Sequence, residues 1–496
     1  MKLPSLTRRP RRVSRAVLAP LFAALVLAGC ATAPAIDPAA LPVAPPAGFK
    51  EGDGRWTTAA PAEAQPRGAW WKAFADPALD ELVERAGQAN NSIQVAAARL
   101  AQARALVRAA DANRAPQVGL GAGASRGTEA GAGPAATTLL SAGASLSYEV
   151  DLVGRLRATS DAASLDARAR EALLQSTRLL VQADVAQAYL VLRAVDEERA
   201  LVRKTVVAYR DTLKLTERRY QAGDVAELDV ARVLTQVAAT ESEALALDRR
   251  RAELEHALAV LVGAAASDFQ LPMAGWATAL PVIPAGVPGT VLARRPDVSA
   301  AQSSMLAAQL RVGVAQAAWF PDLTLTATGG HASTELGDLF QWSARAWGVG
   351  ALLSLPLFDG GRREAGVQNA RAELDAALAG YREQVLVAFR DVEDQLSALR
   401  LLAEQSEAQS RAVASAARAT VLSDSRYRNG LVSQLDLLDA QRSELANRRQ
   451  ALQVRSAQYQ ATVGLVRALG GGWDIADAQR APAGVVGAAQ ARAAGG

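Results

Sequence analysis

Two stretches of this 496-residue chain share one pattern: Arg219-Tyr220-Gln221-Ala222-Gly223 with Leu228-Asp229, and Arg426-Tyr427-Arg428-Asn429-Gly430 with Leu435-Asp436. The second follows the first by 207 residues at every matched position. Other pairs keep this offset or one of 205 residues: Gly154-Arg155 with Gly361-Arg362, Asp184-Val185 with Asp391-Val392, Ile93 with Val298, and Pro116 with Pro321. A register held over so many positions indicates an internal duplication.

Long helices are expected on both sides of the two glycines. Residues 155–262 contain no proline, and Gly223 is their only glycine, while residues 357–481 also lack proline. Ala, Leu, Arg, Gln and Glu dominate both runs and favour helix. Residues 155–219 as one helix would be about 100 Å long, which predicts coiled-coil packing. Each glycine then fits a left-handed C-cap at which the chain reverses.

Two shorter stretches in each copy alternate apolar residues with small or polar ones. They are residues 117–125, 140–150, 322–328 and 347–357. A period of two predicts strands with one apolar face. Strands of about 9–11 residues with lipid outside and water inside span outer membranes. A half-buried strand of a soluble protein has the same pattern, so both interpretations stay open at this point.

Four strands are too few to close a membrane barrel. Bacterial barrels have at least about eight strands, and open sheet edges are not tolerated in lipid. If these strands span the membrane, two chains would supply about 8 of them to a shared barrel and three would supply about 12. The pattern does not choose between the two.

The amino terminus has the features of a secretory signal. Residues 1–29 hold six basic residues and no acidic one, and the apolar stretch 16–28 is too short for a membrane-spanning helix. The signal ends in Leu27-Ala28-Gly29-Cys30, which contains the only cysteine of the chain. This ending resembles a bacterial lipobox, so we expect a covalent lipid on Cys30. An ordinary cleavage site beside a chance cysteine is the alternative.

Composition excludes several classes of protein. With 50% hydrophobic and 21% charged residues, the chain is neither disordered nor a polytopic helical membrane protein. The chain has one cysteine, which argues against a disulfide scaffold and a cysteine-ligated zinc site. It has only two histidines, His256 and His331, which argues against histidine-based catalysis and metal binding. After residue 29 the chain has 48 basic and 50 acidic residues, so its basic pI does not indicate nucleic-acid binding. No enzymatic activity and no cofactor other than the lipid are expected.

Further motifs occur in a fixed order: Trp70-Trp71-Lys72-Ala73-Phe74 with Asp76-Pro77, Arg294-Arg295-Pro296-Asp297-Val298, Phe320-Pro321-Asp322-Leu323, Phe358-Asp359-Gly360-Gly361-Arg362, and the stretch from Tyr427 to Arg442. In this order the chain resembles the TolC-like outer-membrane efflux proteins, especially their NodT-type lipoprotein branch, over residues 70–469.

The resemblance implies a mainly α fold with a small transmembrane β part. Three chains would form a 12-stranded β-barrel, four strands from each chain, continuous with a long periplasmic α-helical coiled-coil barrel. The implied function is the exit duct of a tripartite efflux system that passes small molecules such as drugs from the periplasm to the outside. The implied partners are two further copies of the chain, a periplasmic adaptor (membrane fusion) protein, an inner-membrane pump and outer-membrane lipid.

The expected domains follow from the duplication. Residues 1–29 are the signal peptide, 30–72 a lipid-anchored tether rich in Ala and Pro, 73–280 the first repeat, 281–472 the second repeat and 473–496 a tail. The mature chain is expected in the outer membrane with a large periplasmic portion.

The two reversals are expected to dock the adaptor. Their candidate residues are Arg219, Tyr220 and Gly223 at the first tip and Arg426, Tyr427 and Gly430 at the second. A glycine has no side chain, so a partner backbone can approach it closely. A glycine needed only for the turn is the alternative.

A periplasmic gate is expected beyond the second tip. Asp436 and Asp439 are three residues apart and therefore share one helix face. The resemblance places them on the lumen side of a closed mouth, where Arg442 would pair with a carboxylate. Ser433 and Asp436 also fit a capping box, which is the structural alternative. The first copy has Arg232 in place of Asp439, so the carboxylate pair belongs to the second copy alone.

Two other functions remain open from the sequence. One is the outer-membrane duct of a type I protein secretion system. The other is a periplasmic coiled-coil lipoprotein that conducts nothing, which would leave four amphipathic strands without a role.

Overall fold

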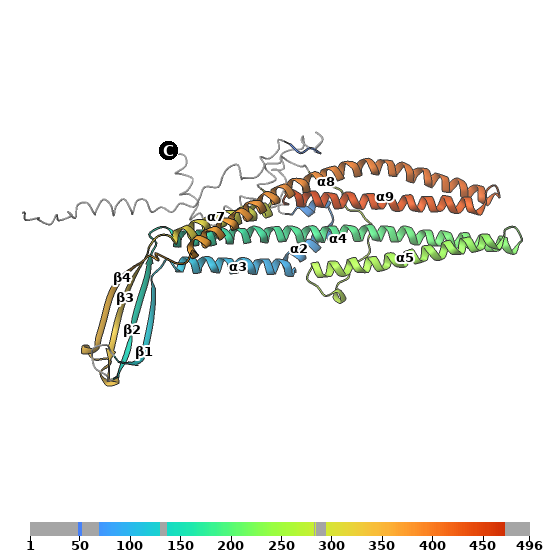
Figure 1. Cartoon of the computed structure of the whole chain (residues 1–496). Helices are drawn as coiled ribbons and strands as arrows, with labels where there is room; N and C mark the ends of the chain where they lie inside the picture. Colours follow the sequence, from blue (N-terminus) through green and yellow to red (C-terminus); the bar gives the residue numbers. More distant parts are fainter. Residues whose placement is uncertain (1–47, 52–68, 129–135, 282, 284–293, 472–496) are drawn as a thin grey trace, which may run out of the picture. The chain divides into compact units, whose positions relative to one another are not determined.

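The computed structural model describes residues 48–51, 69–128, 136–281, 283 and 294–471. Cys30, the signal segment, most of the tether and the tail lie outside the described residues. The main elements are η3 (Trp70–Phe74), α2 (Pro77–Ala89), α3 (Asn91–Ala112), β1 (Gln117–Gly127), β2 (Thr137–Val150), α4 (Arg155–Gln221), α5 (Glu227–Leu261), η4 (Ala266–Asp268), α7 (Pro296–Ala317), β3 (Asp322–Ser333), η5 (Leu336–Asp338), η6 (Trp342–Ala344), β4 (Arg345–Ser354), α8 (Arg362–Arg428) and α9 (Gln434–Ala468) (Figure 1).

The elements repeat in matching lengths. Helices α3 and α7 both have 22 residues, α4 and α8 both have 67, and α5 and α9 both have 35. The single helix expected over residues 155–219 is confirmed, since α4 ends at Gln221. The described residues group into two compact units that cut across the repeats, because the first unit takes residues 101–169 and 302–380.

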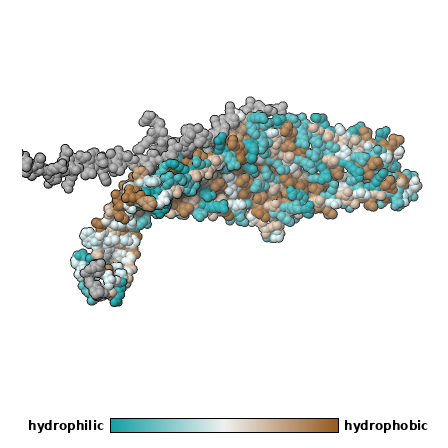
Figure 2. Space-filling model, viewed as in Figure 1, coloured by the Kyte–Doolittle hydropathy of each residue, from teal (hydrophilic) through white to brown (hydrophobic). Residues whose placement is uncertain are grey.

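The first unit contains an antiparallel sheet in the order β1-β2-β3-β4. Its register aligns the predicted faces across all four strands. One row consists of Val118, Leu146, Ala327 and Val349, and the neighbouring row on the opposite face consists of Gln117, Ser147, Thr326 and Gly350. Leu120 is 89% exposed and Trp347 80% exposed, so the apolar face is uncovered in one chain. Figure 2 shows mostly pale and brown residues over the strands and mixed teal and brown residues over the long helices.

The predicted fourth strand extends beyond the carboxyl end of the observed strand β4. Leu355 and Leu357 belong to the predicted alternation, but β4 ends at Ser354. Pro356 follows, and a proline cannot donate a backbone hydrogen bond to a neighbouring strand. The two leucines therefore lie in the connection that leads to α8.

The second unit has an aromatic core built around the residues of the first motif. Trp70 and Trp71 begin η3 inside the expected tether range and are 8% and 7% exposed. The side chain of Asp76 caps α2 and also accepts hydrogen bonds from the hydroxyls of Tyr189 and Thr278 at 2.8 and 2.7 Å. Burial raises the pKa of Tyr189 to about 12, so its hydroxyl stays a donor at neutral pH. The motif thus fastens the start of the folded chain to α4.

None of the helices among the described residues is both long and apolar enough to cross a membrane.

Candidate functional site

The two helical reversals in the second unit have the same backbone geometry. Gly223 has φ of +82° and Gly430 has φ of +73°, as expected for left-handed C-caps. At the first tip the Asp224 N–H bonds the Arg219 carbonyl and the Gly223 N–H bonds the Tyr220 carbonyl, at 2.8 and 2.9 Å. These two bonds define a Schellman motif. A β-carbon on Gly223 would meet no atom within 4 Å, so the glycine is needed for its backbone angle and leaves open space beside it.

The second tip repeats these bonds. The Leu431 N–H bonds the Arg426 carbonyl at 2.8 Å, and the Gly430 N–H bonds the Tyr427 carbonyl at 3.0 Å. No atom lies within 4 Å of a β-carbon built on Gly430. Both tips therefore have the same turn, with an uncovered glycine.

The two tips contact each other through an arginine and a tyrosine. The guanidinium carbon of Arg219 lies 4.8 Å from the centroid of the Tyr427 ring. Tyr427 is only 3% exposed, whereas Tyr220, its counterpart in the first copy, is 46% exposed. Tyr209, Val233, Val237 and Leu438 form a small apolar cluster between the hairpins. The sequence predicts these residues at the tips, but it does not predict that Arg219 contacts Tyr427.

Asp436 is held by its cap. The Ser433 N–H and hydroxyl both donate to the Asp436 carboxylate, at 3.0 and 2.6 Å, and the Asp436 N–H donates to the Ser433 hydroxyl at 3.3 Å. The hydrogen bonds from the Ser433 side chain and backbone lower the pKa of Asp436. The capping box is therefore present, and the carboxylate that it uses is exposed and ionised at neutral pH.

Asp439 and Arg442 are also exposed, with 65% and 48% of their side-chain surface accessible. They form a loose ion pair at 3.9 Å, while the Arg442 Nε donates to Gln236 of α5 at 2.5 Å. In the first copy Arg232 pairs instead with Asp229, at 3.7 Å. The structure thus adds Gln236, whose contact with Arg442 no local sequence motif marks.

Buried polar groups without partners gather at the second tip. Within the described part of the chain, the hydroxyl of Tyr427 and both polar atoms of the Gln434 side chain have no hydrogen-bond partner. Gln434 is the first residue of α9 and is 4% exposed. Leaving a buried polar group unpaired costs about 1–3 kcal/mol. The arrangement of this tip in the single chain is therefore less favourable than its packing alone indicates.

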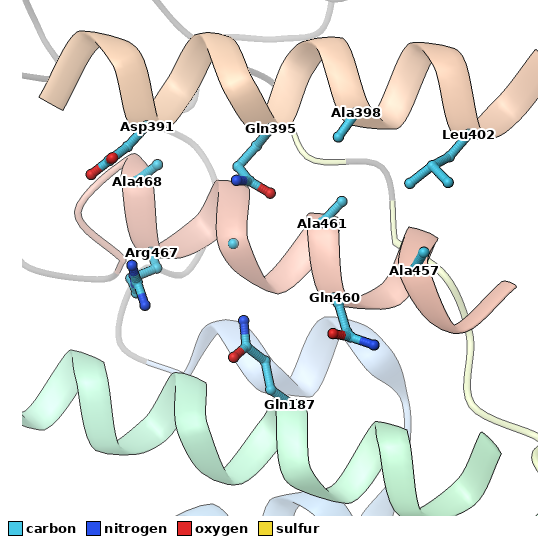
Figure 3. A pocket seen from close by; sticks show the side chains of 11 residues that line it. Gln187, Asp391, Gln395, Ala398, Leu402, Ala457, Gln460, Ala461, Arg467 and Ala468 are labelled. Atoms are coloured by element: carbon cyan, nitrogen blue, oxygen red, sulfur yellow. The ribbon is translucent and has the colours of Figure 1, made fainter. Parts of the chain in front are cut away.

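A polar cavity of about 400 Å³ lies among α4, α8 and α9 in the second unit (Figure 3). Figure 3 shows side chains of Gln187, Gln395 and Gln460 around it, with Asp391 and Arg467 at one end. Amides bind neutral polar groups or water, and Asp391 is already paired with Arg295. Among the described residues no cluster of His, Cys, Asp or Glu could hold a metal ion.

Comparisons with known proteins agree with this architecture. The family model "Outer membrane efflux protein" matches residues 82–264 and 287–471. The chain belongs to the outer membrane efflux protein family. It is 34% identical to the pyoverdine export outer membrane protein OpmQ of Pseudomonas putida, over 90% of this chain and 96% of that protein. It is 32% identical to the solvent efflux pump outer membrane protein SrpC of Pseudomonas putida, over 92% of this chain and 98% of that protein.

Solved structures agree with the fold. The outer-membrane channel OprN is 30% identical, with a TM-score of 0.82, and the match covers 90% of this chain and 100% of that chain. The outer membrane protein VceC of Vibrio cholerae is 29% identical, with a TM-score of 0.77, covering 83% of this chain and 100% of that chain. The likeness confirms the expected fold class, in which each chain adds four strands to an outer-membrane barrel continuous with a helical barrel.

Membership of this family confirms the expected function and location. The chain is the outer-membrane channel of an efflux system, with a large periplasmic part. The alternative of a periplasmic coiled-coil lipoprotein that conducts nothing is set aside, because the family and the relatives are outer membrane efflux and export proteins.

Proposed function

We propose that three copies of this chain form one exit duct for small organic molecules. The sheet carries the proposal, since it presents an aligned apolar face and its outer strands β1 and β4 each have one edge without a partner strand in the described chain. Lipid does not tolerate such edges. Three copies pair every edge in a barrel of about 12 strands, a size within the range of outer-membrane barrels.

The cargo is proposed from relatives of similar length. The names of OpmQ and SrpC assign them to pyoverdine export and to solvent efflux. Pyoverdine and solvents are both small organic molecules. We therefore place small organic compounds ahead of secreted proteins as the cargo of this duct, in a complex with an adaptor and an inner-membrane pump.

The anchor is proposed on Cys30, which lies outside the described residues. The lipobox-like ending Leu27-Ala28-Gly29-Cys30 supports it. Cys30→Ala should abolish labelling of the protein by radioactive palmitate while the barrel still holds the protein in the outer membrane. Labelling that persists in Cys30→Ala contradicts the assignment.

The tips are proposed to dock the adaptor through Gly223 and Gly430. Both glycines are exposed, and an alanine β-carbon at either would meet no atom within 4 Å, although the positive φ would strain its backbone. Gly223→Ala and Gly430→Ala should each reduce export. Gly154→Ala is the matched control, because Gly154 also has positive φ (+76°) and open space around it but lies in the first unit. Equal loss in all three variants would point to backbone strain and against docking.

A cation-binding mouth is proposed from Asp436 and Asp439. Three copies would bring six exposed carboxylates around one axis, a field that retains cations and repels anions. In planar bilayers, Asp439→Ala should weaken block by divalent or trivalent cations. Ser433→Ala, which breaks the cap but removes no charge, should leave the block intact. Asp424→Ala is the control, since it removes a carboxylate that pairs with Arg428 at the same tip.

The duct itself is tested by mass and conductance. Purified protein in mild detergent should have the mass of three chains and should open ion-conducting channels in planar bilayers. Restoration of solvent or drug resistance in a strain that lacks its own duct tests the cargo class. A strict monomer without conductance would contradict the proposal.

A further inference from the structure

Each tip carries an Arg-Tyr pair, but the contact within the chain uses only one residue from each. Arg219 covers the ring of Tyr427, whereas Tyr220 and Arg426 take no part in this contact. Tyr220 is 46% exposed, and the side chain of Arg426 is exposed with no partner among the described residues. The chain therefore presents one uncovered tyrosine on its first hairpin and one uncovered arginine on its second.

The unused pair has the same local geometry as the used one. Arg219 and Arg426 are the residues whose carbonyls accept the long bond of the Schellman turn, at 2.8 Å in both tips. Each tyrosine is the next residue, and its carbonyl accepts the second bond of the turn, at 2.9 Å for Tyr220 and 3.0 Å for Tyr427. Arginine and tyrosine thus leave both hairpins from equivalent positions of equivalent turns.

We propose that Arg426 of one copy lies over the Tyr220 ring of the next copy. This contact would repeat, between chains, the one that Arg219 and Tyr427 make within a chain. An arginine offered by one hairpin and a tyrosine offered by the other make a head-to-tail contact, which closes into a ring when the rotation per copy fits. The inference rests on the proposed trimer, in which six Arg–Tyr contacts would then join six hairpin tips.

Physical chemistry favours the pairing of these two side chains. The face of an aromatic ring attracts a guanidinium, and the attraction strengthens when the pair is shielded from water. Tyr427 illustrates the covered state, with 3% exposure. The same cover over Tyr220 would remove an aromatic ring from water at the mouth of the duct.

Cross-linking in the purified duct tests the contact without an adaptor present. Tyr220→Cys combined with Arg426→Cys should give covalent dimers and trimers on a denaturing gel after treatment with a short thiol-reactive cross-linker. Arg219→Cys combined with Tyr427→Cys is the calibration, because its link lies within one chain and should give no larger species. Tyr220→Cys with Arg428→Cys is the matched control, since Arg428 is exposed but pairs with Asp424. Each single-cysteine variant serves as the control for cross-links that form through the native Cys30.

The outcomes separate this inference from the proposed function. If the native protein is a monomer, the trimer itself is wrong. If the protein is a trimer and the Tyr220–Arg426 pair gives no interchain link while the calibration pair reacts, the contact is wrong and these residues face something else, such as the adaptor.

A second measurement covers the case in which the cysteine variants fail to assemble. Tyr220→Leu and Arg426→Gln should each speed dissociation of the detergent-solubilised trimer by about two- to fivefold per contact. The double variant should dissociate no faster than the single ones, because both remove one interaction. Tyr220→Phe keeps the ring and should match the native protein. Additive effects, or a loss with Tyr220→Phe equal to that with Tyr220→Leu, would overturn the contact.

Discussion

Removal of the Arg295 guanidinium should loosen the junction between α7, α8 and α9 in the second unit. Arg295 is 6% exposed and donates to Asp297 at 2.7 and 3.1 Å, to Asp391 at 3.2 Å and to the Ala468 carbonyl at 3.1 Å. Burial alone would lower the pKa of Arg295, but the two carboxylates raise it above its ordinary value, so the group is charged. It therefore acts as a charged donor at the end of α9.

The size of the effect follows from burial. Breaking a buried ion pair from one side costs about 3–5 kcal/mol when the remaining charge stays buried. The Asp297 and Asp391 side chains are 26% and 23% exposed, so water can reach them in Arg295→Ala. We expect about 2–3 kcal/mol of local stability to be lost. Arg390→Ala is the control, because Arg390 also pairs with Asp391 but its side chain is 65% exposed, and such pairs contribute about 0–1 kcal/mol.

Native-state hydrogen exchange of the detergent-solubilised protein measures this loss where it occurs. Amides in the last turn of α9 should exchange about 30- to 160-fold faster in Arg295→Ala, which is the rate equivalent of 2–3 kcal/mol. In Arg390→Ala they should change by less than about fivefold. Equal protection in Arg295→Ala and the native protein would refute the reasoning, as would equal losses in the two variants.

Three other predictions concern the turn at Gly263, the cap at Asp436 and the buried hydroxyl of Tyr459. Gly263→Ala should lower the thermal unfolding midpoint measured by circular dichroism, because Gly263 has φ of +69° and its β-carbon would lie 2.5 Å from the Ala89 carbonyl oxygen; Gly87→Ala, in open space on α2, should not. Asp436 has a lowered pKa, so its cap should persist above the ordinary value of 3.8 and be lost as the pH falls below it, which exchange of the Ser433 amide should show. In Ser433→Ala that pH dependence should weaken, because the hydroxyl bond is lost while the backbone N–H of residue 433 still donates to Asp436. Tyr459→Phe should destabilise the second unit by about 1 kcal/mol in denaturant unfolding, since the Tyr459 hydroxyl bonds the Thr278 carbonyl, whereas Tyr220→Phe should not.

The long helices were predictable because strong local signals agree with one another. Proline is absent from residues 155–262, and the only glycine coincides with the reversal, so propensity and packing favour the same structure. Strand limits were less predictable. The expected third strand stopped at Thr328, but β3 continues to Ser333 through glycines and a histidine that show no apolar alternation. Their pairing is set by the register with β2, which depends on the neighbouring strand.

The sequence predicted where the tip residues lie along the chain, but it did not predict which residues they contact. The pattern Arg-Tyr-x-x-Gly fixes a Schellman turn, because glycine alone takes positive φ without strain. The Arg442 partner Gln236 is 206 residues away, and the Arg219 partner Tyr427 is 208 residues away. Such partners depend on which hairpin faces lie together, and the local pattern of either hairpin contains no information about that.

The two copies show what the duplication preserves. The carbonyl of Leu261, at the end of α5, accepts from the Asn90 side chain at 2.9 Å, and the carbonyl of Ala468, at the end of α9, accepts from Arg295 at 3.1 Å. The acceptors are 207 residues apart and the donors 205, which are the two offsets of the repeat. The last carbonyls of a helix have no hydrogen-bond donor within that helix. Both copies therefore place a donor side chain at the same position beside this helix end. A neutral amide meets the need in the first copy, whereas in the second a charged guanidinium also recruits Asp297 and Asp391. Divergence therefore changed the chemistry of the donor at a fixed backbone contact, which is why the second copy should be the more sensitive of the two to substitution at this junction.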